Sequence, residues 1–179
     1  MVTLNKRSER AALVAWVAVL AIFVSVGAAH LRSQVVPGNA FPSLASSGLV
    51  GNLPDTSGKV VLVDFWASWC APCKASFPAY SRLQAAYAGR GLTVVAVSVD
   101  DSPEAYAAFI AKLKPAFVTV HDAGHKLVSV VQVPTMPTSY LVDRAGKVRF
   151  VHAAFHGDQT ERELRGEIET LLDEKAPSP

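Results

Sequence analysis

The sequence predicts an α/β domain in which helices cover both faces of a mixed central sheet, preceded by an N-terminal transmembrane helix. Three features of the 179 residues lead to this fold class. Strand-like and helical segments alternate along residues 60–131, which is typical of parallel strands. The central strand segments are almost entirely apolar, so helices must cover both of their faces. A 19-residue apolar stretch near the N-terminus is long enough to cross a bilayer.

The stretch at residues 11–29 is hydrophobic at every position except Ser25 and Gly27. As a helix it would extend about 28 Å, close to the thickness of the hydrocarbon core of a membrane. This length favours an uncleaved anchor over a signal peptide, whose apolar core is about 7–15 residues. The small residues at 27–29 keep cleavage by a signal peptidase open as the alternative.

Residues 1–10 form a basic leader that we expect to stay in the cytoplasm. Lys6, Arg7 and Arg10 precede the apolar stretch, and the positive-inside rule then places the rest of the chain outside the cytoplasm. We therefore expect a single-pass protein of the inner membrane, with its domain in the periplasm or otherwise on the extracytoplasmic side.

Three further regions follow the apolar stretch. Residues 30–58 are rich in Pro, Gly, Ser and Asn, and predict a linker and an irregular segment that docks through Phe41 and Leu44. Residues 59–175 are expected to form the folded domain, and 176–179 a short tail. Because the first 34 residues hold four of the 17 basic residues and one of the 15 acidic residues, the domain is nearly neutral, and we expect no binding to nucleic acid.

The elements of the domain follow from hydrophobic pattern, caps and turn residues. A capping box at Thr160 and Glu163 is expected to open the last helix, and Gly146 provides the left-handed position of a hairpin turn. Strands are predicted at 60–66, 92–99, 116–120, 138–142 and 148–153. Helices are predicted at 73–88, 103–112, 126–131 (a short helical or irregular piece) and 160–174.

The two cysteines of the chain form Cys70-Ala71-Pro72-Cys73, between a predicted strand and a predicted helix. The N-terminus of a helix carries free N–H groups and partial positive charge, and both stabilise a thiolate at Cys70. Cys70 is therefore the expected attacking sulfur. Cys73, within the helix, would attack back to resolve a mixed disulfide.

Other uses of the pair remain open from sequence. A purely structural disulfide would close a loop of four residues, which removes little chain entropy. Two His-x₃-His pairs, at 121–125 and 152–156, could add a third ligand for Cu(I), which favours thiolates. A copper chaperone is therefore the alternative to thiol redox chemistry.

Two motifs resemble those of the thioredoxin superfamily, in particular the membrane-tethered TlpA/ResA/DsbE-like thiol-disulfide oxidoreductases. The first is VDFWASWCAPCK at residues 63–74, and the second is VPTMPTSYLVD at 133–143, which matches the segment that carries the family's cis-proline. The similarity extends over residues 37–172. It implies a thioredoxin-like fold, no cofactor, and exported proteins with disulfides as substrates.

The resemblance also implies roles for individual residues. Pro137 is expected to be cis beside the cysteines, and the backbone of Met136 to pair with an extended substrate segment. Asp64 would lie buried behind Cys73 and exchange a proton with it. Trp69 and Trp66 would flank the site as rigid apolar surface, although core positions for both would look the same in sequence.

The direction of electron flow implied by the resemblance is reductive. Re-reduction would then come from a membrane electron donor of the DsbD/CcdA type, with a thiol oxidant as the alternative. Lys74 could add positive charge near Cys70. The acidic residue that commonly stands three positions after the second cysteine in ResA-like and DsbE-like reductases is Ser76 here, which weakens the case for a role in cytochrome maturation.

Overall fold

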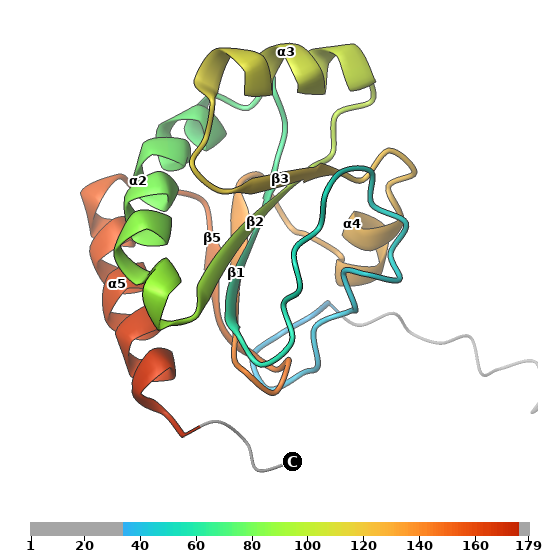
Figure 1. The fold of residues 1–179 in the computed structure, drawn as a ribbon. Helices are drawn as coiled ribbons and strands as arrows, with labels where there is room; N and C mark the ends of the chain where they lie inside the picture. The colour runs from blue at the N-terminus through green and yellow to red at the C-terminus, as the bar shows by residue number, and fades with distance from the viewer. Residues whose placement is uncertain (1–33, 176–179) are drawn as a thin grey trace, which may run out of the picture. The chain divides into compact units, whose positions relative to one another are not determined.

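A five-stranded mixed sheet forms the centre of the domain in the computed structural model, which describes residues 34–175 (Figure 1). The strand order is β3-β2-β1-β4-β5. β2 is parallel to both β1 and β3, whereas β4 is antiparallel to β1 and β5 is antiparallel to β4. The mixed sheet predicted from sequence is therefore confirmed, and the structure adds the strand order. The strands are β1 (Val60–Trp66), β2 (Leu92–Ser98), β3 (Val118–His121), β4 (Thr138–Val142) and β5 (Val148–Ala153).

Alternate residues of β1 point into two separate hydrophobic clusters, one on each face of the sheet. Val60, Leu62 and Trp66 pack against α2 and α5, which lie side by side in Figure 1. Val61 and Val63 pack on the opposite face, where α4 and the segment before β1 cover the sheet. Both faces are thus covered, as the apolar strands require. The helices are α2 (Ala71–Tyr87), α3 (Pro103–Leu113), α4 (Lys126–Val131) and α5 (Asp158–Asp173), with a 3₁₀ turn at Ala88–Arg90.

The segment before β1 docks on the sheet as predicted. Leu44 is buried, and the Phe41 ring lies 5.5 Å from that of Tyr140 in β4. The hairpin turn between β4 and β5 also has the predicted form, because Gly146 adopts a positive φ of 77°.

Three predicted element starts are wrong by two residues, those of α2, β3 and α5. α2 begins at Ala71 rather than at residue 73, because Cys70 is its N-cap. β3 begins at Val118 rather than at residue 116, because the strand pairs with β2 only from Val118 onward. The last helix begins at Asp158, with Gly157 as its N-cap at φ 64°. The hydroxyl of Thr160 accepts the His156 N–H at 3.0 Å, so the expected capping box does not form. Gly157 could have indicated this helix start from sequence, because the positive φ of the N-cap position favours glycine.

The predicted transmembrane helix at 11–29 and the basic leader at 1–10 lie outside the described residues. Among residues 34–175, no helix has the length and apolar character needed to cross a bilayer.

Candidate active site

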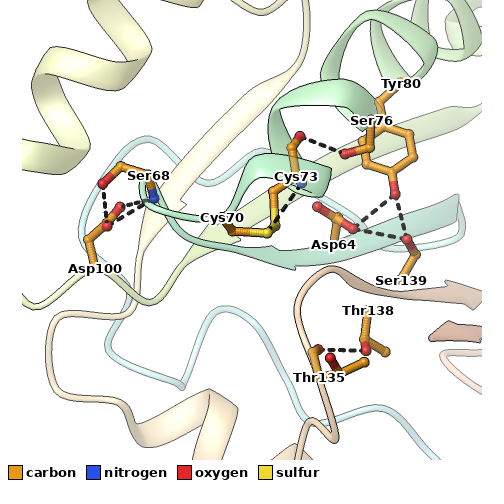
Figure 2. Close-up of a disulfide and its surroundings, with 10 residues drawn as sticks. All are labelled: Asp64, Ser68, Cys70, Cys73, Ser76, Tyr80, Asp100, Thr135, Thr138 and Ser139. Carbon is orange, nitrogen blue, oxygen red and sulfur yellow. Dashed lines mark hydrogen bonds between the residues drawn. A yellow bond between two sulfur atoms is a disulfide. The ribbon is translucent and has the colours of Figure 1, made fainter. Parts of the chain in front are cut away.

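Cys70 and Cys73 are joined by a disulfide at the N-terminus of α2 (Figure 2). Cys70 is the N-cap residue, and its Sγ accepts the backbone N–H of Cys73 at 3.2 Å. Cys73 is fully buried, while Cys70 retains 5% of its surface. Of the two cysteines, only Cys70 therefore has surface that a partner can reach.

The local sequence favours a negative charge on Cys70 once the disulfide is reduced. Pro72 occupies the first turn of α2, where a missing N–H costs no hydrogen bond, and that turn contains no acidic residue. The positive end of a 17-residue helix is therefore not offset by a nearby carboxylate on the same turn. Lys74, which could add positive charge near Cys70, has its ammonium over the ring of Phe109, 6.0 Å from the ring centroid.

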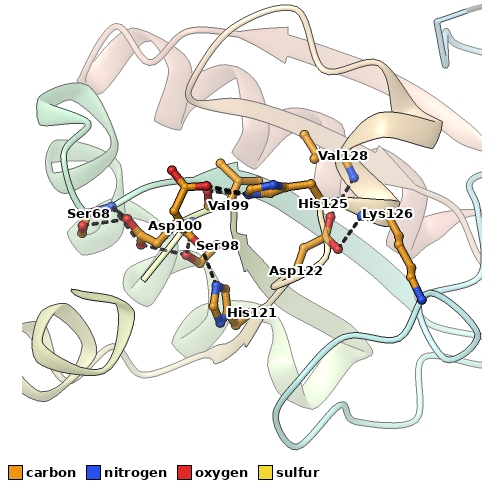
Figure 3. Close-up of polar contacts among 10 residues, drawn as sticks. Ser68, Ser98, Val99, Asp100, His121, Asp122, His125, Lys126 and Val128 are labelled. Carbon is orange, nitrogen blue, oxygen red and sulfur yellow. Dashed lines mark hydrogen bonds and ion pairs between the residues drawn. The ribbon is translucent and has the colours of Figure 1, made fainter. Parts of the chain in front are cut away.

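A buried carboxylate at Asp100 holds the loop that joins β1 to Cys70 (Figure 3). It accepts the Ser68 N–H at 3.0 and 3.1 Å, the Ser68 hydroxyl at 2.7 Å and the Ser98 hydroxyl at 2.8 Å. The Asp100 carbonyl in turn contacts Nε2 of His121 at 2.7 Å. These bonds fix the backbone two residues before Cys70. This contact was not predicted from the sequence, although Asp100 follows a strand of the buried type.

Asp64 lies in β1 on the face that packs against α2, and its side chain is completely buried. Oδ1 accepts the Tyr80 hydroxyl at 3.0 Å and the Ser139 hydroxyl at 2.9 Å, and these two hydroxyls are 2.7 Å apart. Oδ2 has no hydrogen-bond partner among the described residues. In Figure 2 the carboxyl group lies between the disulfide and the Tyr80–Ser139 pair.

Burial raises the pKa of Asp64 from its ordinary value of 3.8 to about 7, because the ionised form loses its hydration. The hydrogen bonds from Ser139 and Tyr80 act in the opposite direction and lower this pKa. The net result is a carboxyl group that can gain or lose a proton near neutral pH, as a general acid or base requires. Its two hydroxyl partners were not predicted, because they are remote in sequence.

The peptide bond between Met136 and Pro137 is cis, as expected. Thr138 opens β4 opposite Phe65, one residue before the end of β1, so the cis bond lies at the edge of the sheet where Cys70 follows. The carbonyl of Pro137 accepts the Ala154 N–H at 2.8 Å. Met136 packs against the cluster that contains both cysteines, and within residues 34–175 its backbone makes no hydrogen bond to another residue.

The two tryptophans of the first motif occupy different environments. Trp69 is 68% exposed immediately before Cys70, and offers apolar surface next to the sulfur. Trp66 is fully buried, with its ring 4.6 Å from Phe109 and 5.1 Å from Phe77. Trp66 therefore takes the core position that the sequence left open, beneath α3, and offers no surface at the site.

Three of the four histidines in the two His-x₃-His pairs have side chains that make other contacts. Nε2 of His121 contacts the Asp100 carbonyl, Nε2 of His125 lies 3.1 Å from the Val99 carbonyl, and Nε2 of His152 contacts Glu167 at 2.7 Å. In the part of the chain from 34 to 175, no group of three or more His, Cys, Asp or Glu side chains is placed to hold a metal ion.

Comparison with known proteins identifies the relatives of this chain. Residues 38–151 match the AhpC/TSA family, which covers more than half of the sequence. The chain belongs to the AhpC/TSA family. Among its relatives is the thiol-disulfide oxidoreductase ResA of Bacillus cereus, which is 30% identical over 143 residues that span 78% of this chain and 81% of ResA.

Solved structures agree with this assignment of the AhpC/TSA-family chain. A Chlorobium tepidum protein assigned as a thiol:disulfide interchange protein DsbE has a TM-score of 0.72 and 35% identity, over 78% of this chain and 99% of that chain. The thioredoxin domain of a Bacteroides vulgatus thiol-disulfide oxidoreductase has a TM-score of 0.65 and 25% identity, over 75% and 99% of the two chains. The fold is thus thioredoxin-like, and this AhpC/TSA-family member is a thiol-disulfide oxidoreductase of the ResA/DsbE type.

Proposed function

We propose that this protein reduces disulfides of exported proteins at the outer side of the bacterial inner membrane, anchored by residues 11–29. The observation that carries the proposal is the Cys70–Cys73 disulfide at the N-terminus of α2, with Cys70 as the more exposed cysteine. Nothing else in the described residues combines a redox-active pair with an anion-stabilising helix end.

The first step forms a mixed disulfide. The Cys70 thiolate attacks one sulfur of a substrate disulfide, the substrate S–S bond breaks, and the other substrate sulfur leaves as a thiolate that takes a proton from water. The helix N-terminus stabilises the attacking thiolate. The free backbone of Met136 and the ring of Trp69 provide the surface on which an extended substrate segment would lie.

The second step releases the reduced substrate. Cys73 passes its thiol proton to Asp64 and attacks Sγ of Cys70, which breaks the mixed disulfide and expels the second substrate thiolate. Two electrons have then moved from the cysteine pair to the substrate, and the Cys70–Cys73 disulfide is restored. Burial of Asp64 suits it to this proton transfer, because its pKa of about 7 lies near the working pH.

The cycle requires a reductant for the restored disulfide. In an oxidising compartment outside the cytoplasm, the electrons must be delivered across the membrane. A membrane electron donor of the DsbD/CcdA type would supply them by thiol–disulfide exchange with Cys70.

The variant Cys73→Ala tests the order of the two cysteines. When reduced Cys73→Ala is incubated with insulin, Cys70 is expected to form a mixed disulfide that nothing resolves, because the second sulfur is absent. Non-reducing electrophoresis and mass spectrometry should show an adduct that dithiothreitol releases.

The matched control is Cys70→Ala, which also lacks the disulfide but retains the buried sulfur. It is expected to give at most about one tenth of the adduct, since Cys73 has no exposed surface. Equal or greater adduct formation by Cys70→Ala would assign the attack to Cys73 and contradict the proposed order.

A further inference from the structure

The two oxygens of the Asp64 carboxyl group have different surroundings. Oδ1 accepts two hydroxyls, from Tyr80 of α2 and Ser139 of β4, at 3.0 and 2.9 Å. Oδ2 is buried and has no partner among residues 34–175. In Figure 2 the hydroxyl pair and the disulfide lie on opposite sides of the carboxyl group. A carboxylate held in this way keeps one oxygen bound to the protein and leaves the other free for a proton.

Tyr80 and Ser139 reach this position from different parts of the chain. Ser139 is the cross-strand neighbour of Asp64 in the antiparallel pair of β1 and β4, so its hydroxyl is fixed by strand register. Tyr80 lies two turns after Cys73 in α2, and is 1% exposed. Because both residues belong to elements packed on β1, the carboxyl group cannot rotate without breaking two hydrogen bonds.

We propose that Tyr80 and Ser139 are positioning residues that bind Oδ1 of Asp64, so that Oδ2 exchanges the proton of Cys73. The inference rests on the proposed function, since it refines the proton transfer between Asp64 and Cys73. It assigns a role in the redox cycle to two hydroxyls that do not touch the reacting sulfur atoms.

Few polar or charged groups surround Asp64, so the effect of the two hydroxyls on its pKa can be measured. α2 contributes Tyr80 and Cys73, β4 contributes Ser139, and the β2 neighbour is the apolar Ala96. Among the described residues, no Lys, Arg, His or second carboxylate forms an ion pair with Asp64. The two hydroxyls are therefore the groups that lower its pKa against the effect of burial.

Removal of these hydroxyls is expected to raise the Asp64 pKa above its value of about 7. Loss of one hydrogen bond to a carboxylate corresponds to a rise of about one pH unit, and loss of both to about two. The variants are Tyr80→Phe, Ser139→Ala and the double variant. The Asp64 ¹³Cγ shift should be followed by NMR between pH 4 and 10 in the oxidised enzyme, where neither cysteine titrates.

The control variant is Tyr140→Phe, which removes a different buried tyrosine hydroxyl from the residue after Ser139. That hydroxyl has no partner among the described residues, so its loss should leave the Asp64 pKa unchanged. Ser139→Thr keeps a hydroxyl at the same place and should restore the parental pKa. If the two hydroxyls were merely structural, their removal would lower stability but would not raise the Asp64 pKa selectively in the Tyr80 and Ser139 variants.

The pH profile of insulin reduction provides the second readout. Asp64 must be ionised to accept a proton, so the rate of insulin reduction should rise as the pH passes through the Asp64 pKa. In Ser139→Ala the midpoint of this rise should lie about one pH unit higher. An Asp64 pKa that stays unchanged or falls in the double variant would overturn the positioning role. If the NMR shift occurs but the parent protein reduces no disulfide, the positioning role stands and the reductase proposal fails.

Discussion

The variant Asp64→Asn is expected to lose a large dependence of stability on pH that the parent protein possesses. From pH 4 to pH 8 its free energy of unfolding should rise relative to that of the parent by about 4 kcal/mol. The reason is that Asp64 is fully buried, with a pKa of about 7 in the folded state against 3.8 as its ordinary value. Asparagine occupies the same volume but carries no titrating proton.

The sign of this effect follows from proton binding. Between pH 3.8 and about 7 the folded parent holds a proton on Asp64 that the unfolded chain has released. The parent is therefore destabilised as pH rises through this window, and the full cost is present above pH 7. At pH 8 we expect Asp64→Asn to be more stable than the parent by about 2 kcal/mol, because its unpaired buried amide N–H offsets part of the gain.

Urea unfolding of both oxidised proteins at pH 4, 6 and 8 measures this difference. Asp101→Asn is the matched control, since the Asp101 side chain is 95% exposed and its replacement should leave the pH dependence unchanged. Parallel stability curves for Asp64→Asn and the parent would mean that Asp64 titrates normally in the folded protein.

The variant Cys70→Ser is expected to reduce insulin with dithiothreitol at least ~10³-fold more slowly than the parent. A serine hydroxyl at this position remains protonated and cannot exchange with a disulfide, whereas a Cys70 thiolate is stabilised by the helix N-terminus. The initial rate of insulin precipitation, corrected for the uncatalysed reaction of dithiothreitol, gives the measurement.

A control must separate loss of the nucleophile from a disturbance of the loop that carries Cys70. Ser68→Ala leaves both cysteines in place but removes one hydrogen bond from the Asp100 carboxylate that fixes the same loop. It should retain activity within about tenfold of the parent. Cys70→Ser activity close to that of Ser68→Ala would contradict a nucleophilic role for Cys70.

The sequence predicted the elements whose signals are local. The apolar run at residues 60–66 is β1, the helix predicted to begin at residue 103 does so, and Gly146 marks a hairpin turn where expected. The cysteine pair stood out because it joined a strand pattern to a helix pattern. Periodicity carries no information on neighbours within a sheet, so the strand order emerged only from the structure.

The parts of the site that were missed depend on contacts between distant residues. Ser139 meets Asp64 across 75 positions and Asp100 meets Ser68 across 32. Trp66 and Trp69 look alike in sequence, yet one lies in the core and the other at the surface, because the chain leaves the sheet between them. Such distinctions arise from tertiary packing rather than from local pattern.

The midpoint potential of the Cys70–Cys73 pair tests the proposed direction of electron flow most directly. Equilibration with dithiothreitol or glutathione buffers, followed by alkylation of free thiols and mass spectrometry, gives this value. A reductase should have a potential nearer to the value of about −270 mV for thioredoxin than to the value of about −120 mV for DsbA. A potential near −120 mV would show that the pair instead transfers disulfides to its substrates, and would contradict the reductase proposal.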